Sequence, residues 1–153
     1  MKNIKFYIAS EKDIPFILET YKENIDYLHG NNRDYETWKS LLSQKESTYY
    51  IVEDDEQVAW FRSEIEDNTL WLGMLQVSPK YKRQGYGKSI LLFIEELAKE
   101  NNINMLGIHT TEDNIPARSL YELMGYEVIE VGECTTADGV NRIGYTFSKN
   151  IKK

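Results

Sequence analysis

The sequence has one cysteine, Cys134, in 153 residues, so no disulfide can form within the chain. No run of apolar residues approaches the roughly 20 that a membrane-spanning helix needs, and the first fifteen residues lack the apolar segment of an export signal. We therefore expect a cytoplasmic protein with no membrane partner. A nucleophilic role for Cys134 is not expected either, because it precedes a predicted turn at the end of a strand.

Positively charged residues are also few, with 18 Lys and Arg residues against 25 Asp and Glu residues and a net charge of -7. This balance argues against a nucleic-acid-binding protein, whose footprint is basic. Acidic residues are absent from Asn68 to Ile94, where Lys80, Lys82, Arg83 and Lys88 lie. The acidic run at 53–56 falls in a predicted hairpin turn, so we expect solvated side chains there and no metal site. One basic region on an acidic protein indicates a local anion site.

Hydrophobic periodicity predicts the elements of the fold. A strand at 4–8 precedes a helix at 14–28, which Ser10 and Asp13 begin as a capping box, and a shorter helix that Asp34 caps. Three strands joined by polar turns follow, then a strongly apolar helix, a buried strand, a helix capped by Asn114 and ended by Gly125, and two last strands. The predicted ranges of these later elements are 47–53, 57–65, 69–77, 88–100, 103–110, 114–124, 127–134 and 142–148.

The order βααβββαβαββ predicts a single domain over residues 1–153 with a mixed α+β fold. We expect a central, twisted, mostly antiparallel sheet flanked by helices. The strand–helix–strand unit in the middle of the chain predicts one parallel pair of strands.

The segment YKRQGYGKS, residues 81–89, combines two glycines, three basic side chains and a serine. A P-loop needs glycine where this chain has Lys82, and the dinucleotide-binding fingerprint needs glycine where it has Ile90. What is left is a strand, a glycine-containing loop and a helix N-terminus, whose free N–H groups favour a phosphate ligand. A solvated basic loop is the alternative.

Two segments resemble the signatures of a known family. LGMLQVSPKYKRQGYGKSILLFIEEL resembles the signature region of the GNAT superfamily of acyl-CoA N-acyltransferases, and EDNIPARSLYELMGYEV resembles its second signature. Together they span about Leu72 to Tyr126. Where the family usually has Arg or Gln this chain has Lys82, followed by Arg83. The resemblance implies a GNAT-like fold and an N-acetyltransferase that moves the acetyl group of acetyl-CoA to a primary amine without a metal.

The resemblance also implies where acetyl-CoA binds. The strand that ends at Val77 is expected to separate from the strand at 103–110 at a bulge, for which Gly73 is suited, with the pantetheine arm in the gap. An N–H group near Leu75 or Gln76 would polarise the thioester carbonyl. The implied cofactor contacts are Leu75, Gln76, Val77, Lys82, Arg83, Gln84, Gly85, Tyr86, Gly87, Lys88, Ser89, Asn114 and Tyr121.

Tyr121 corresponds to the general acid of the family, a phenol that protonates the departing thiolate. Its place on the apolar face of a helix also fits a purely structural role, and Asn114 likewise fits a plain N-cap. For the base we consider Glu64 first and His109 second. An outward-facing strand residue and a structural histidine are the respective alternatives.

The two N-terminal helices carry acidic and aromatic side chains together, a combination that suits a cationic amine. We take Tyr27, Trp38 and Glu64 as candidates for the acceptor site, whether the amine belongs to a small molecule or a peptide. A solvated acidic face is the alternative. An acyl-CoA-binding regulatory module without turnover is the alternative function, and a homodimer stays open because the last strand pair leaves a sheet edge.

Overall fold

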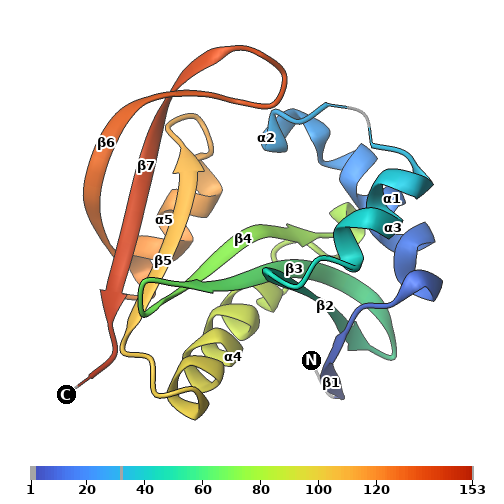
Figure 1. Cartoon of the computed structure of the whole chain (residues 1–153), viewed down its shortest axis with the longest axis horizontal. Helices are drawn as coiled ribbons and strands as arrows, with labels where there is room; N and C mark the ends of the chain where they lie inside the picture. Colours follow the sequence, from blue (N-terminus) through green and yellow to red (C-terminus); the bar gives the residue numbers. More distant parts are fainter. Residues whose placement is uncertain (1–2, 32, 153) are drawn as a thin grey trace.

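The computed structural model describes residues 3–31 and 33–152, which form a seven-stranded sheet flanked by helices (Figure 1). The strand order is β1-β2-β3-β4-β5-β7-β6. The elements are β1 (Ile4–Ile8), α1 (Ile14–Glu23), α2 (Ile25–Leu28), α3 (Tyr35–Leu42), β2 (Ser47–Asp54), β3 (Glu56–Glu66), β4 (Thr69–Val77), α4 (Tyr86–Glu100), β5 (Met105–Thr111), α5 (Ile115–Leu123), β6 (Glu127–Thr135) and β7 (Asn141–Asn150), with 3-10 turns at Glu11–Asp13 and Pro79–Tyr81. The predicted α+β class and the predicted order of strands are confirmed.

The helix predicted at 14–28 is wrong in one respect, because it breaks at Asn24 into α1 and the short α2. The amide Nδ2 of Asn24 donates a 3.0 Å hydrogen bond to the carbonyl oxygen of Val77, at the end of β4. His29 then ends α2 in the left-handed conformation, with φ of 50°. The break therefore ties the N-terminal helices to the end of a central strand, a long-range contact that local periodicity does not report.

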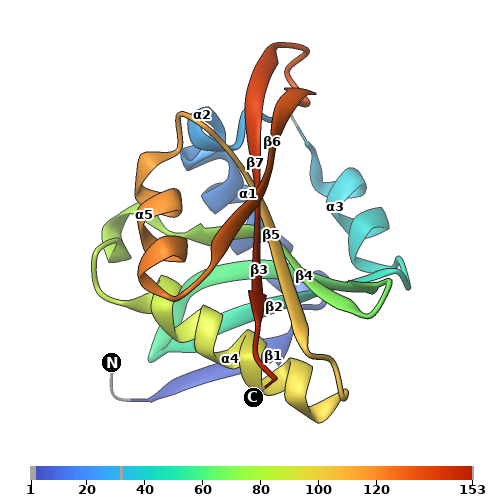
Figure 2. The same ribbon diagram turned by 90° about the vertical axis from the view of Figure 1, so that its left-hand side faces the viewer.

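Two apolar clusters cover the two faces of the sheet. One includes Ile90 and Ile94 of α4, and the other packs α1 and α3 against β2 and β3. Figure 2 shows α5 and α3 on opposite sides of the strands β5 and β7, which are seen edge-on. Within the described part of the chain, no helix combines the length and the apolar character that crossing a membrane requires.

The sheet opens between β4 and β5, its one parallel pair. Pairing covers only Thr69–Leu72 with Met105–Ile108, although both strands continue beyond it. On its other edge β4 carries one extra residue, since Gly73 pairs with Arg62 whereas Gln76 pairs with Trp60. Met74 at this bulge has φ of 47°. The expected separation of the strands is confirmed, and the residue in the left-handed region is Met74 rather than Gly73.

Candidate functional site

A cavity of about 890 Å³ lies in the gap that the separated strands leave. Its walls come from the end of β4 (residues 74–77), the end of β5 (109–111), the start of α4, one side of α5, and β6 and β7. This volume falls in the range of small-molecule and cofactor sites. The parallel pair, which ends at Leu72 and Ile108, thus positions the site.

The loop before α4 forms one end of the cavity. Gly85 occupies the N-cap with φ of 87°, a conformation that side chains disfavour. The first bond of the helix runs from the Ser89 N–H to the Gly85 carbonyl at 3.1 Å, so the N–H groups of residues 86–88 have no helical acceptor. Lys82, Arg83 and Lys88 line the cavity beside them. Since the first turn of α4 holds no acidic residue, this end suits a pyrophosphate.

Gly87 lets α4 approach α5 closely. A Cβ atom there would lie 2.8 Å from Cδ2 of Leu120, closer than packed carbon atoms allow. Two of the expected cofactor contacts, Gln84 and Ser89, are not among the residues that line the cavity. The Ser89 hydroxyl donates to the Gly85 carbonyl at 3.2 Å and so turns back onto its own helix.

The side chain of Tyr86 reaches the end of β2, contrary to the simplest expectation for a cofactor contact. It is buried, and its hydroxyl donates a 2.7 Å hydrogen bond to Oδ2 of Asp54. This bond raises the pKa of Tyr86 to about 12. Its main chain is therefore the part that can contribute to the anion-binding loop.

Tyr121 lies on the opposite wall, on α5. The side-chain oxygen of Asn114 begins this helix by accepting the Ala117 N–H at 3.4 Å, and both Asn114 and Tyr121 line the cavity. The Tyr121 ring packs 5.5 Å from the ring of Phe147. Burial raises the pKa of Tyr121 well above its ordinary value, so the phenol keeps its proton at neutral pH.

Of the two candidates for the base, only His109 lies at the cavity. His109 lines the cavity, where its Nδ1 lies 3.0 Å from Oγ1 of Thr146 and its ring stacks on Trp71 at 4.7 Å. Glu64 does not line the cavity, and in the sheet it pairs with Trp71 and Ser47. The structure thus brings His109 and Tyr121, but not Glu64, to one cavity.

The expected acceptor wall is corrected at Trp38. This side chain is fully buried, with ring centroids of Tyr21, Tyr49 and Trp60 at 5.4, 5.8 and 5.3 Å, so it belongs to the core. The side chain of Tyr27 lies outside the described part of the chain. The acidic side chains of the N-terminal helices are exposed, and none of them lines the cavity: Glu19, Glu23, Asp26, Asp34 and Glu36.

Sequence reasoning missed the far wall of the cavity, which β6 and β7 supply through residues 130–134 and 144–146. It also missed the ion pair of His29 Nε2 with Asp113 Oδ2, at 2.8 Å, which joins α2 to the β5–α5 loop. Strand alternation was the only signal for the residues of this wall, and it does not identify partners. Among the described residues, no group of three or more His, Cys, Asp and Glu side chains could hold a metal ion.

Comparison with known proteins supplies a family and a fold. The family model described as "Acetyltransferase (GNAT) family" matches residues 14–126. A sequence search of curated proteins finds no match. Among solved structures, the ribosomal-protein-S18-alanine N-acetyltransferase from Escherichia coli is similar at a TM-score of 0.79 and 16% identity, over 99% of this chain and 96% of that one.

Two further solved structures were determined with the cofactor or its product. YncA, a putative acetyltransferase from Salmonella typhimurium with its cofactor acetyl-CoA, matches at a TM-score of 0.78 and 13% identity, over 98% of this chain and 95% of that one. The PaiA N-acetyltransferase from Thermoplasma acidophilum in complex with coenzyme A matches at 0.73 and 20% identity, over 97% and 99%. At such identities the likeness shows a shared fold.

Proposed function

The chain belongs to the GNAT acetyltransferase family, and from that premise we propose that it transfers the acetyl group of acetyl-CoA to a primary amine by direct attack within a ternary complex. One observation carries this proposal. A single cavity joins the anion-binding loop at the start of α4, the unpaired end of β4 and the hydroxyl-bearing side chain of Tyr121. An extended thioester with a pyrophosphate at one end matches that arrangement.

The residues present fit acetyl-CoA at both ends of the cavity. The N–H groups of residues 86–88, with Lys82 and Lys88 beside them, would hold the pyrophosphate. Beyond Leu72, the edge of β4 that faces β5 has no partner strand in the described chain. Its main-chain groups would bind the pantetheine amides as an added strand would, with an N–H near Leu75 or Gln76 directed at the thioester oxygen.

The reaction then needs one proton donor and one proton acceptor. The amine nitrogen attacks the thioester carbon, the carbon–sulfur bond breaks, and the departing thiolate takes the proton of Tyr121. The amine loses its proton to His109, directly or through water. The Nδ1 atom of His109 is hydrogen-bonded to the Thr146 hydroxyl, so Nε2 is the nitrogen that takes the proton of the amine. Glu64 is the weaker candidate for the base because it does not line the cavity.

Thiol release from acetyl-CoA, measured with a panel of primary amines, tests the proposal. We expect release that depends on the amine, and mass spectrometry should find the acetylated amine in equal amount. Calorimetry with coenzyme A should show binding. Tight binding of coenzyme A without amine-dependent release across the panel would instead indicate a regulatory module that kept the cofactor site.

A further inference from the structure

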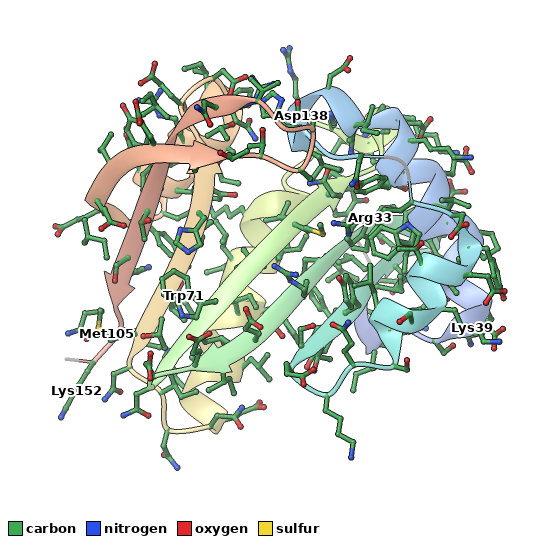
Figure 3. The ribbon with its side chains drawn as sticks, turned by 45° about the horizontal axis from the view of Figure 1, so that its top comes forward. Arg33, Lys39, Trp71, Met105, Asp138 and Lys152 are labelled. Atoms are coloured by element: carbon green, nitrogen blue, oxygen red, sulfur yellow. The ribbon has the colours of Figure 1, made fainter. Side chains whose placement is uncertain are left out.

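The face of the sheet that carries Trp60 also carries polar side chains beyond α3. Tyr49 of β2 pairs with Arg62 of β3, and Arg62 pairs with Gly73 of β4, so these residues form one row across three strands. Figure 3 looks onto this face, with Trp71 at one end and Arg33 near the other. The row ends at the bulge of β4, directly beside the cavity.

The buried phenol of Tyr49 marks the centre of this row. Tyr49 is 3% exposed, and its hydroxyl oxygen lies below the surface. Burial raises the pKa of Tyr49, whereas the charges of Arg62 and Arg33 and a side-chain hydrogen bond from Arg62 lower it. Tyr49 therefore helps to hold the Arg62 guanidinium group in place and is not itself open to a ligand.

The two guanidinium groups beside Tyr49 lack a carboxylate partner. The Arg62 side chain crosses Gly73 so closely that a Cβ atom there would lie 2.6 Å from Nη2. Arg33 lies over the rings of Tyr21 and Trp38, at 5.1 and 5.2 Å. Neither arginine forms an ion pair with a carboxylate of the described residues. Two positive charges thus lie beside the bulge of β4, Arg62 at Gly73 and Arg33 at Met74.

Met74 connects this cluster to the reaction site. Its side chain belongs to the cavity wall, and its sulfur lies 3.8 Å from Nη1 of Arg33. A molecule held by the arginines would therefore lie against the bulge of β4, on the acceptor side of the thioester position. Glu64, two residues from Arg62 on the same face of β3, supplies a negative charge beside this row.

We infer that the acceptor amine carries a carboxylate, which Arg33 and Arg62 bind at the bulge of β4. The inference rests on the proposed function and names its substrate class: small amino acids and related amino-carboxylates. A carboxylate accepts hydrogen bonds from two guanidinium groups at once and supplies the negative charge that the pair lacks. A purely cationic amine would meet two like charges here, so the acidic N-terminal helices do not set the specificity.

Matched acceptors test the inference. Glutamate, methionine and phenylalanine should each be acetylated with a kcat/KM at least about ten-fold above that of the corresponding α-carboxamide, which keeps the amine and loses the charge. Peptides that begin with the same residues serve as a third arm, because their first residue lacks the free carboxylate. Equal rates for acids, amides and peptides would overturn the inference and leave the acetyltransferase proposal standing.

The variant Arg62→Gln tests whether Arg62 binds the carboxylate of the acceptor. It should raise KM for the amino acids about 10- to 100-fold and change kcat and the amide rates little, whereas Arg62→Lys should recover part of the loss. Lys39→Gln is the matched control, since it removes one exposed positive charge on the outside of α3 (Figure 3). An unchanged KM in Arg62→Gln would overturn the assignment.

A binding measurement tests the carboxylate site independently of acetyl transfer. If no amine is acetylated, the proposed function fails, but calorimetry with coenzyme A present still reports on the anion site. Binding of glutamate, methionine or phenylalanine and not of its amide, lost in Arg62→Gln, supports the site. Absence of that difference overturns it.

Discussion

The hydroxyl of Tyr86 donates a 2.7 Å hydrogen bond to Oδ2 of Asp54, and so fixes the first turn of α4 to the end of β2. Tyr86 also packs edge-on against Tyr81, 6.3 Å away, on the other side of the basic loop. The loop proposed to hold the pyrophosphate is therefore anchored from inside the protein. Contacts within the protein, and not only a ligand, set the shape of this loop.

Loss of this anchor should weaken both the fold and cofactor binding. We expect Tyr86→Phe to lower the free energy of unfolding by about 1–2 kcal/mol, because a buried hydrogen bond to a carboxylate is lost, and to raise the Kd for coenzyme A several-fold. Urea unfolding and calorimetry measure the two effects. Tyr50→Phe is the control, since the Tyr50 ring stacks on Phe61 at 5.1 Å and the substitution keeps that ring.

The same bond predicts a dependence on alkaline pH. The pKa of Tyr86 is raised from 10.0 to about 12, so its contribution to stability is complete below pH 10 and is lost as the pH rises through the folded value. The difference between the wild type and Tyr86→Phe should therefore be constant from pH 7 to pH 9. A difference that disappears within that interval would contradict the assignment.

The backbone conformation of Gly85 should be needed for binding coenzyme A. Its φ of 87° lies in the left-handed region, so Gly85→Ala should cost about 1 kcal/mol of stability and weaken coenzyme A binding as the loop adjusts. Gly139→Ala is a matched control: φ is 84° there, and no atom lies within 4 Å of an added Cβ. It should cost similar stability and leave the Kd unchanged. Equal Kd values for the two variants would refute the role of the loop.

Removal of the Tyr121 hydroxyl should affect turnover far more than binding. We expect Tyr121→Phe to lower kcat by about 10²- to 10⁴-fold, the usual contribution of general acid catalysis, with the Kd for coenzyme A within about two-fold. Stopped-flow thiol detection measures the rate. Tyr126→Phe is the control, because that hydroxyl is also buried and has no partner in the described residues. A fully active Tyr121→Phe enzyme would remove Tyr121 from the mechanism.

The pair of His29 and Asp113 should stabilise the fold through the Asp113 carboxylate. A hydrogen bond from Thr111, and then the charge of His29, lower the pKa of Asp113 below 3.8. The contribution of Asp113 to the free energy of unfolding is thus present above pH 3.8 and is lost as the pH falls through the lower pKa of the folded state. Because the carboxylate is half exposed, Asp113→Asn should cost only about 0.5 kcal/mol.

Urea unfolding of Asp113→Asn between pH 8 and pH 3 measures this effect. The difference from the wild type should persist down to about pH 5 and shrink only below pH 4. Glu19→Gln, on the exposed side of α1, should show no such difference. A gap that closes by pH 6 would show that Asp113 is not the titrating group.

Much of the fold followed from local sequence. Asp34 caps α3, where its Oδ1 accepts the Thr37 N–H at 2.9 Å, and Asn114 begins α5 in the same way. Caps, turns and the change of apolar period act over a few residues, so the sequence displays them directly. The family signatures likewise located the loop at 81–89, because the glycines that shape its backbone are adjacent in the chain.

The sequence by itself therefore determined the order of the elements, the family and the place of the loop proposed to bind the pyrophosphate. Only the tertiary structure decided which residues belong to the core and which lie at the proposed acceptor site. Periodicity reports that Trp38 faces inward, but the burial of its ring depends on Tyr21, Tyr49 and Trp60 from three other elements. Arg33 and Arg62 meet at Tyr49 through strand register and the break at Asn24, contacts between residues far apart in the chain that no local pattern encodes.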